Sequence, residues 1–191
     1  MREVSTVLLE KFDGEFYNCV LKSESDPLKL LSLVLENFPC YRDHTEYVGH
    51  KISFLMKAQM LIVGVSRILK EFNDTAAFDI PSGFSIATTN RVVQMMRFYG
   101  LLEVSSHVMK KMEKGYLFQF GEPEEVEMRA LANKCLEILT SLVNDRLRSE
   151  GSEASLTRMD IDYMIDRDRI ESITTKNFGT VYFPKLRSIF Y

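Results

Sequence analysis

The stretch of sequence that decides the fold is residues 51–72, KISFLMKAQMLIVGVSRILKEF. Its apolar residues recur at the three- and four-residue spacing of a helix, and they occupy more than one face of it: Ile52, Phe54, Leu55, Met60, Ile62, Val63 and Leu69. A helix that is apolar on most sides is normally buried. The sequence therefore predicts one long helix over 51–72 at the centre of a helical protein.

Further helices are predicted on both sides of this one. Asp26-Pro27 reads as an N-cap followed by proline at the first helical position, and Pro39 stops that helix. Residues 73–85 are rich in loop formers. After them, Thr88 or Thr89 caps a helix that Gly100 closes.

The C-terminal half continues the helical pattern. Helices are predicted over 105–114, over 122–151 and over 156–169. The longest, 122–151, has acidic residues in its first turn and basic ones in its last, as the helix dipole favours. Its predicted buried stripe is Met128, Leu131, Cys135, Ile138 and Leu142. Strand signals are weak and limited to 116–120 and 181–183.

The C-terminus, residues 181–191, is rich in aromatic and aliphatic side chains (VYFPKLRSIFY). So much apolar surface is costly to leave in water, so we expect this tail to dock on the core. Residues 1–10 form an apolar helix face with no cap before it. We expect a single all-α domain over 1–191, shortened from a larger protein or assembled with another chain.

Composition narrows the classes of function. The net charge of −3 argues neither for nor against a polyanionic partner, but no basic stripe stands out, so direct nucleic-acid binding is not expected. Three scattered cysteines, Cys19, Cys40 and Cys135, suit a reducing compartment. Residues at the N-terminus do not resemble a signal peptide, so none is expected, and the longest apolar run, residues 60–65, is too short to span a membrane. A cytoplasmic or nuclear location is expected.

Several kinds of site are excluded by spacing. His44, His50 and His107 have no ligand partner at helical spacing, so no metal site is expected. Glycine-rich phosphate loops and a serine-hydrolase elbow are absent from the sequence. Cys40 lies four residues before His44 and could be a nucleophile, but an inert thiol is expected there.

Carboxylates remain as candidates for chemistry. Asp162 and Asp166 are one helical turn apart on the same face. If they are partly buried, one of the two pKa values should rise and the two should work as an acid/base pair. The alternative is a solvated acidic face, balanced by Arg158, Arg167 and Arg169.

A second group of candidates could bind an anion. Arg91 and Gln94 lie in the first turns of the helix that follows the threonine cap, and helix N-termini favour anions. Lys57, on the predicted central helix, could line the same pocket or form half of an internal ion pair. The acidic run that includes Glu125 suits the start of a helix without any function.

Several segments together resemble the queuosine-salvage family. They follow the family's order along nearly the whole chain: residues 8–14, 18–20, 38–43, 56–59, 91–94, 121–122, 125–129, 162–163 and 183–191. The resemblance implies an all-helical fold similar to that of helix-hairpin-helix DNA glycosylases. It also implies hydrolysis of the N-glycosidic bond of queuosine 5'-monophosphate, a small nucleotide, to release queuine. No cofactor is implied.

That reaction needs an acidic group near the anomeric carbon to stabilise an oxocarbenium-like transition state and to handle the attacking water. A phosphate-reading site and an aromatic surface for the deazaguanine base would complete the pocket. The resemblance assigns substrate binding to seven residues of this chain: Lys57, Thr89, Arg91, Gln94, Glu125, Arg129 and Tyr163.

The chain departs from the family at informative positions. The family motif Ala-Asp-Tyr-Arg-x-Pro-Gln reads Thr88-Thr89-Asn90-Arg91-Val92-Val93-Gln94 here, so Thr89 replaces the Asp expected to be catalytic. Met56 replaces the lysine of the family's Lys-Arg-Ala-Gln pattern. Asp166-Arg167 replaces a Trp-Asp pair that follows the tyrosine in the family. The family's N-terminal part is missing from this sequence.

Two hypotheses follow from these departures. Either Asp162, with Asp166, supplies the acidic group and the chain is a divergent glycosylase, or catalysis is lost. In the second case the chain is a ligand-binding or helical interaction module, with a partner chain replacing the missing N-terminal part.

Overall fold

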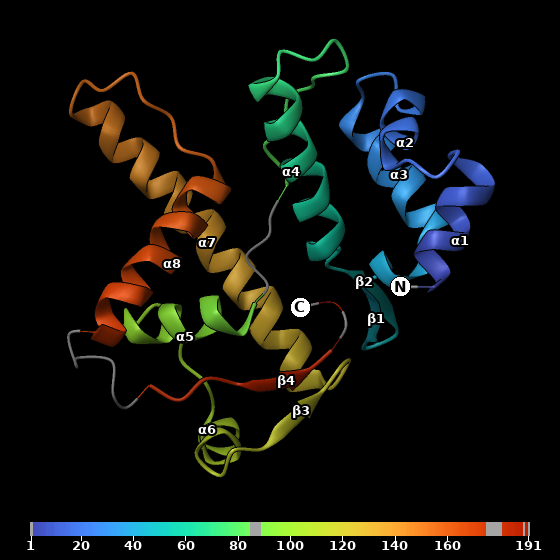
Figure 1. Cartoon of the computed structure of the whole chain (residues 1–191). Coiled ribbons are helices and arrows are strands. Elements are labelled where there is room, and N and C mark those ends of the chain that lie inside the picture. Colours follow the sequence, from blue (N-terminus) through green and yellow to red (C-terminus); the bar gives the residue numbers. More distant parts are fainter. Residues whose placement is uncertain (1, 85–88, 175–180, 189, 191) are drawn as a thin grey trace. The chain divides into compact units, whose positions relative to one another are not determined.

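The structure is a computed structural model that describes residues 2–84, 89–174, 181–188 and 190 (Figure 1). Within these residues it is mostly helical, with eight α-helices and two small two-stranded sheets, which confirms the predicted fold class. The chain divides into two compact units. The first comprises Met1–His44, Ser53–Phe84 and Phe190, and the second comprises Thr45–Ile52, Ser85–Ile189 and Tyr191. The single-domain assignment stays a prediction.

The first unit contains four α-helices and a 3₁₀ turn: α1 (Arg2–Lys11), α2 (Phe16–Lys22), α3 (Pro27–Asn37), η1 (Pro39–Tyr41) and α4 (Met56–Glu71). The predicted cap of α3 is confirmed, because the Asp26 carboxylate accepts hydrogen bonds from the backbone N–H groups of Leu28 (2.8 Å) and Lys29 (3.2 Å). Phe38 follows α3 and is buried against the rings of Phe12 and Phe16.

The helix predicted over 51–72 begins later than expected. Residues His50–Ser53 form strand β2, which pairs with β1 (His44–Tyr47). Val48 and Gly49 both have positive φ, as a tight hairpin requires. Helix α4 also buries only part of its surface, since Met60 and Ile68 are about half exposed. The apolar content of this stretch thus reflects a strand followed by a one-sided helix.

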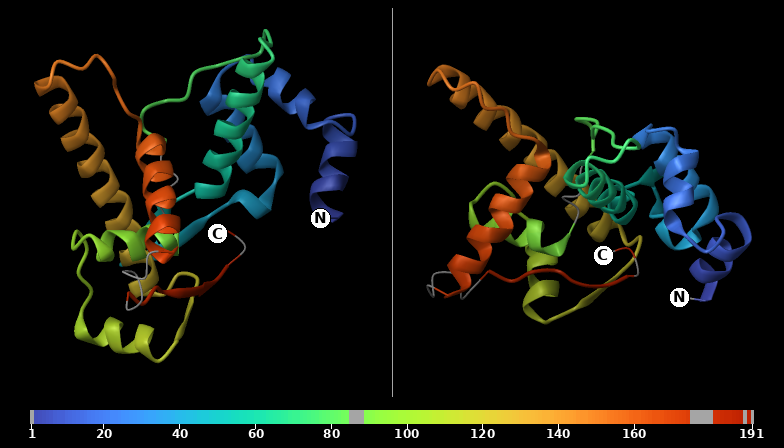
Figure 2. Two further views of the ribbon diagram at one scale, coloured as in Figure 1. Left: turned by 60° about the vertical axis from the view of Figure 1, so that its left-hand side comes forward. Right: turned by 45° about the horizontal axis from the view of Figure 1, so that its top comes forward.

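The second unit contains four helices and the strands of the second sheet: α5 (Asn90–Phe98), α6 (Ser106–Glu113), β3 (Leu117–Gln119), α7 (Pro123–Ser149), α8 (Arg158–Thr174) and β4 (Lys185–Arg187). Thr89, one of the two residues predicted to do so, caps α5. Ser105 caps α6. Helix α5 packs against both α7 and α8, as the views in Figures 1 and 2 agree. Its core-facing residues are Val92, Val93, Met95 and Met96.

The stripe predicted for α7 is wrong in register. Met128 is buried, but Leu131, Ile138 and Leu142 are about half exposed, and Cys135 is only partly buried. The buried residues are instead Glu125, Val126, Met128, Arg129, Ala132, Leu136 and Thr140. This helix carries two adjacent lines of apolar residues. The buried line also contains the ion pair of Glu125 and Arg129, and because these residues are charged, apolar periodicity does not predict that they are buried.

The tail segment, defined as residues 181–188, docks on the second unit as expected. Three side chains on one face of α5 donate hydrogen bonds to its backbone carbonyls: Asn90 to Pro184 (3.4 Å), Gln94 to Val181 (2.8 Å), and Arg97 to Tyr182. The strand predicted at 181–183 lies further on, at β4, which pairs in parallel with β3.

The aromatic side chains are not what holds the tail segment. Tyr182 and Phe183 stay more than 40% exposed, whereas Leu186, opposite Phe118 in the parallel pair, packs against the core. Ile189 and Tyr191, part of the predicted docking, lie outside the described residues. Hydrogen bonds to the main chain, the buried Pro184 and the partly buried Leu186 therefore hold the tail segment, where burial of aromatic rings was expected.

We predict that Gln94→Ala loosens the tail segment. The loss of one partly buried hydrogen bond should lower the unfolding free energy by about 1 kcal/mol. Urea unfolding measures that change, and hydrogen exchange should show faster exchange over 181–187 than in the parent chain. Arg91→Ala is the matched control, since Arg91 is exposed on the same helix. Equal exchange in Gln94→Ala and the parent would contradict the assignment.

Candidate functional site

The N-terminal turns of α5 carry three of the predicted substrate-binding residues. Thr89 is the N-cap, and its hydroxyl accepts a hydrogen bond from the Val92 N–H at 3.4 Å. Arg91 is exposed, so its guanidinium can meet a solute at this helix end. Gln94 is partly buried and its amide donates to the tail segment. The hydrogen-bonding capacity of Gln94 is thus partly used inside the protein.

Glu125 and Arg129, on α7, form a buried ion pair. The side chains are 0% and 1% exposed, and Arg129 Nη1 lies 3.4 Å from Glu125 Oε1. Glu125 Oε2 also accepts a hydrogen bond from the backbone N–H of Gly121 (3.1 Å), which ties the turn before α7 to its first turn. Removing one member of such a pair lowers the free energy of unfolding strongly, because the other charge is left buried without a partner. The geometry therefore gives both residues an evident structural role.

The pair formed by Asp162 and Asp166 lies on α8, which begins with a capping box. Thr157 precedes the helix, and its hydroxyl and N–H both donate to the Asp160 carboxylate. Burial raises the pKa of Asp162 to about 6, with the negative charge of Asp166 as the smaller cause. Asp166 accepts a hydrogen bond from Arg169 Nε at 2.9 Å and remains 44% exposed.

The two carboxylates of this pair thus differ in environment. Asp162 is largely removed from water, which raises its pKa to about 6, while Asp166 is ion-paired with Arg169 at the surface. Of the three arginines expected to balance a solvated acidic face, Arg169 does so for Asp166, and Arg158 pairs instead with Glu137. Asp162 therefore has the character expected of a functional carboxyl group.

Tyr163 and Lys57 complete the predicted set. Tyr163 follows Asp162 directly and is 68% exposed, so its ring offers a free apolar face. Lys57 lies on α4 and belongs to the first unit, whereas the other predicted site residues belong to the second. Its ammonium lies 5.4 Å from the centre of the Tyr41 ring. The remaining predicted residues come from three helices, α5, α7 and α8, that pack on one another.

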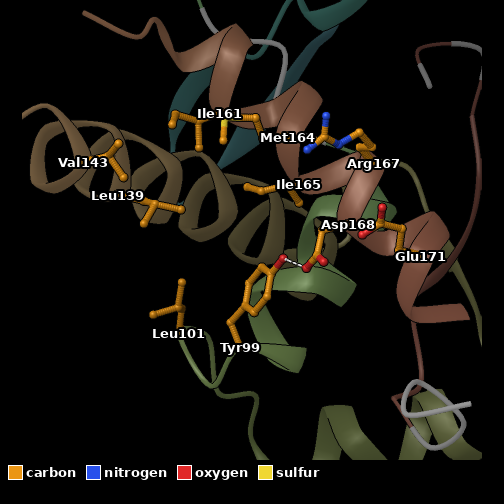
Figure 3. Close-up of a pocket in the computed structure, with 10 residues that line it drawn as sticks. All are labelled: Tyr99, Leu101, Leu139, Val143, Ile161, Met164, Ile165, Arg167, Asp168 and Glu171. Carbon is orange, nitrogen blue, oxygen red and sulfur yellow. Dashed lines mark hydrogen bonds between the residues drawn. The ribbon is translucent and has the colours of Figure 1, made fainter. Parts of the chain in front are cut away.

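A separate cavity lies on another side of α8 (Figure 3). Its volume is about 420 Å³, and its lining comes from the end of α5, the residue Leu101, the middle of α7 and one face of α8. The Tyr99 hydroxyl donates a hydrogen bond to Asp168 at this cavity. The pKa of Tyr99 is raised, mainly because the hydroxyl is partly buried and to a smaller extent because it donates this hydrogen bond.

None of the predicted site residues lines this cavity. Asp162 and Asp166 each follow a lining isoleucine, Ile161 and Ile165, by one position, which turns their side chains by about 100° around the helix. Sequence reasoning missed Tyr99 as a partner of Asp168, because the two are 69 residues apart. It also missed Arg97, although Asn90, Gln94 and Arg97 recur at helical spacing as a polar line.

Within the described ranges, no three His, Cys, Asp or Glu side chains are grouped so that they could hold a metal ion. Over the same residues, no helix is both long enough and apolar enough to cross a bilayer.

Comparison with known proteins identifies the family. The sequence model described as "Queuosine salvage protein" matches residues 1–191. Proteins named queuosine 5'-phosphate N-glycosylase/hydrolase are similar: the one from Bos taurus is 35% identical over 155 residues, which are 81% of this chain and 45% of that protein. The one from Mus musculus is 34% identical over 164 residues (85% and 48%).

A bacterial relative of the same name, from Sphaerobacter thermophilus, is 27% identical over 195 residues, which are 100% of this chain and 56% of that protein. The chain thus spans about half the length of the curated relatives it matches. The family model covers every residue of the chain, and two of these relatives exceed 30% identity. This chain belongs to the queuosine salvage protein family.

Proposed function

We propose that this chain hydrolyses the N-glycosidic bond of queuosine 5'-monophosphate and releases queuine. Family membership supports the reaction class. The observation that supports the proposal within this chain is the largely buried carboxyl group of Asp162 on α8, whose pKa burial raises to about 6. Perturbed carboxyl groups of this kind concentrate at functional sites.

In the proposed reaction, the bond between the anomeric carbon and the base nitrogen breaks as water attacks that carbon. Positive charge develops on the sugar, and the ionised Asp162 stabilises it and accepts the proton of the attacking water. Asp162 then gives up this proton through the solvent to the nitrogen of the released base, which returns Asp162 to its ionised form. Asp166 keeps negative charge beside Asp162, and Arg169 holds Asp166 in place.

The remaining residues are proposed to bind the nucleotide. Arg91, exposed at the N-terminal end of α5, suits a phosphate. The exposed ring of Tyr163 suits stacking on the base. Glu125, Arg129 and Gln94 contribute by fixing α7 and the tail segment, while Thr89 and Lys57 remain candidates for direct contacts.

A second candidate function is that of a family member without catalysis. Such a chain would bind the nucleotide, or it would bind a partner chain that supplies the part of the relatives' sequence that this chain does not match. One observation favours it: Thr89 stands at the position of the motif Asp and serves as the N-cap of α5. A threonine hydroxyl carries no charge at neutral pH, so the carboxylate of the motif is lost.

The first test is direct. Incubation of the chain with queuosine 5'-monophosphate should release free queuine, measured by chromatography, and Asp162→Asn should lower the rate about 10²–10⁴-fold. Asp166→Asn is the matched control and should cost less, because its carboxylate is already paired with Arg169. If the parent chain releases no queuine while thermal shift shows that it binds the nucleotide, the non-catalytic candidate replaces the first.

Thr89→Asp should restore the motif carboxylate without harm to the fold, since Asp caps a helix at least as well as Thr. We expect queuine release to rise by about 10²-fold or more if the position still faces the bound nucleotide. Thr89→Asn keeps the cap and adds no charge, so it should leave the rate unchanged. Equal rates in the two variants would remove this position from the reaction.

The raised pKa of Asp162 also predicts a pH-dependent stability. The folded value is about 6 and the ordinary value is 3.8, so the protonated form is favoured by folding. Its contribution is fully present below pH of about 4 and is lost as the pH rises through about 6, by roughly 3 kcal/mol in the unfolding free energy. Over the same interval, hydrolysis should increase, since the ionised form is the reactive one.

Urea unfolding at several pH values measures this change. Asp162→Asn should lack the fall in stability and should be more stable than the parent at pH of about 7.5. Asp166→Asn should keep most of the fall, because burial is the larger cause of the raised Asp162 pKa. An Asp162→Asn chain with the parent's pH dependence would show that Asp162 is solvated.

A further inference from the structure

We propose that a basic surface of the second unit binds single-stranded nucleic acid without regard to its sequence. This surface, the basic face, is made by four exposed side chains at the end of α6 and on β4: Lys110, Lys114, Lys185 and Arg187. None of them belongs to the predicted substrate-binding residues, so the basic face is separate from the proposed reaction.

The fold joins these cations from two segments that are distant in the sequence. Lys110 is in the last turn of α6, and Lys114, the C-cap, lies one turn further on the same side. Lys185 and Arg187 are two residues apart on β4 and so share one side of that strand. Helix α6 leads into β3, which pairs with β4 (Figure 1), and at Gly115 between α6 and β3 an added Cβ atom would lie 3.1 Å from Lys185 Nζ. Neither segment alone is a basic stripe, which is why the sequence did not predict nucleic-acid binding.

Most of the charge on this surface is uncompensated. Residues 106–121 and 181–188 contain five Lys or Arg side chains and a single carboxylate, Glu113, within a chain whose net charge is −3. In the part of the chain that the structure describes, Lys111 is the one member of the five that is ion-paired, with Glu124. The basic face therefore presents four cations to solvent against one neighbouring carboxylate, an excess that attracts polyanions.

Two more carboxylates follow at the start of α7 and are already bound. The Glu122 carboxylate accepts hydrogen bonds from the Tyr116 hydroxyl (2.6 Å) and from the backbone N–H of Gln119 (2.9 Å). The Glu124 carboxylate accepts one from Lys111. Both carboxylates are thus engaged by groups other than those of the basic face.

Exposed aromatic rings beside the cations favour nucleic acid over other polyanions. Tyr182 and Phe183 precede the cations of β4 in the tail segment and are 47% and 42% exposed. Their main chain is fixed, because Arg97 donates a hydrogen bond to the Tyr182 carbonyl and Asn90 donates one to the Pro184 carbonyl. Rings that are fixed and still exposed can stack on bases at little cost in conformational entropy. An acidic polypeptide offers no bases for such stacking.

The geometry of β4 suits an extended single strand. Side chains two residues apart on one side of a β-strand are about 6.6 Å apart along it, which is close to the separation of neighbouring phosphates in an extended strand of nucleic acid. Lys185 and Arg187 can therefore contact successive phosphates while a nearby base stacks on an aromatic ring. Bases that are paired in a duplex are not free to stack in this way.

The test measures the binding of a fluorescein-labelled oligouridylate to the full chain by fluorescence anisotropy. A length of about 12 nucleotides lies within the site sizes of single-strand binding proteins. Binding should weaken as salt rises, and the slope of log K against log salt should be about −2.8 if all four cations contact phosphates. An oligothymidylate of equal length should bind within about threefold of the RNA, because backbone charge and stacking do not depend on sequence.

Two pairs of substitutions on different elements test the basic face. One chain carries Lys185→Gln with Arg187→Gln on β4, and the other carries Lys110→Gln with Lys114→Gln at the end of α6. Each pair should reduce the magnitude of the slope by about 1.4 and weaken binding about tenfold at low salt. Thermal unfolding shows that each chain is folded, and the second pair leaves the tail segment untouched.

The matched control removes two exposed cations outside the basic face, with Lys51→Gln and Arg67→Gln. It changes the net charge by the same amount and should leave the slope as in the parent chain. Phe183→Leu keeps an apolar side chain and removes the ring, so it should weaken binding about fivefold at every salt concentration without changing the slope.

The proposal fails if the parent chain does not bind the oligonucleotide at low salt and about 100 μM protein, where contacts to several phosphates suffice for binding. It also fails if both variant pairs keep the parent's slope, since the nucleic acid would then bind elsewhere. Displacement of the oligonucleotide by polyglutamate of equal charge, with no effect of Phe183→Leu, would show that the basic face takes an acidic polypeptide instead.

Discussion

The packing of α5 against α7 and α8 is the interaction on which the second unit depends. Four of the nine residues of α5 are buried in the common core, and each of the two larger helices contributes its own apolar face to that core. A nine-residue helix is too short to persist alone in water. Its position, and with it the direction of Thr89 and Arg91, is therefore set by tertiary packing. The polar edge of the same helix then binds the tail segment through main-chain carbonyls.

Local signals predicted much of this fold because caps and turns are decided by neighbouring residues. The cap at Asp26, the start of α7 at Pro123 and the end of α5 at Gly100 all depend on side-chain or backbone chemistry within a few positions. The register of α7 could not be predicted in the same way. Two apolar lines compete on that helix, and the choice between them is made by α5 and α8, which are distant in sequence.

In the candidate site, too, the features set by neighbouring residues were predicted and those set by tertiary contacts were not. Spacing alone placed Asp162 and Asp166 on one face of a helix, but it treated them alike. Burial distinguishes them, and burial depends on how α8 lies against its neighbours. Glu125 and Arg129 were predicted from the family pattern as substrate-binding residues, and the structure adds that they form an ion pair with both charges fully enclosed. The pairing of Tyr99 with Asp168 had no signal in the sequence, since it joins two helices through a side-chain contact.

If the family motif places an aspartate at position 89, as the resemblance implies, the cap of α5 explains how the fold could persist with threonine there. An N-cap needs a short side chain with an oxygen that accepts a backbone N–H, and both Asp and Thr provide one. Thr89 does so through its contact with Val92, so the start of α5 and the core behind it are preserved. An exchange of Asp for Thr would remove the negative charge and keep the cap, so the requirements of folding alone do not distinguish the two residues. Asp162 is in the opposite position, because burial raises its pKa to about 6 and the protein is more stable with Asp162 protonated than ionised.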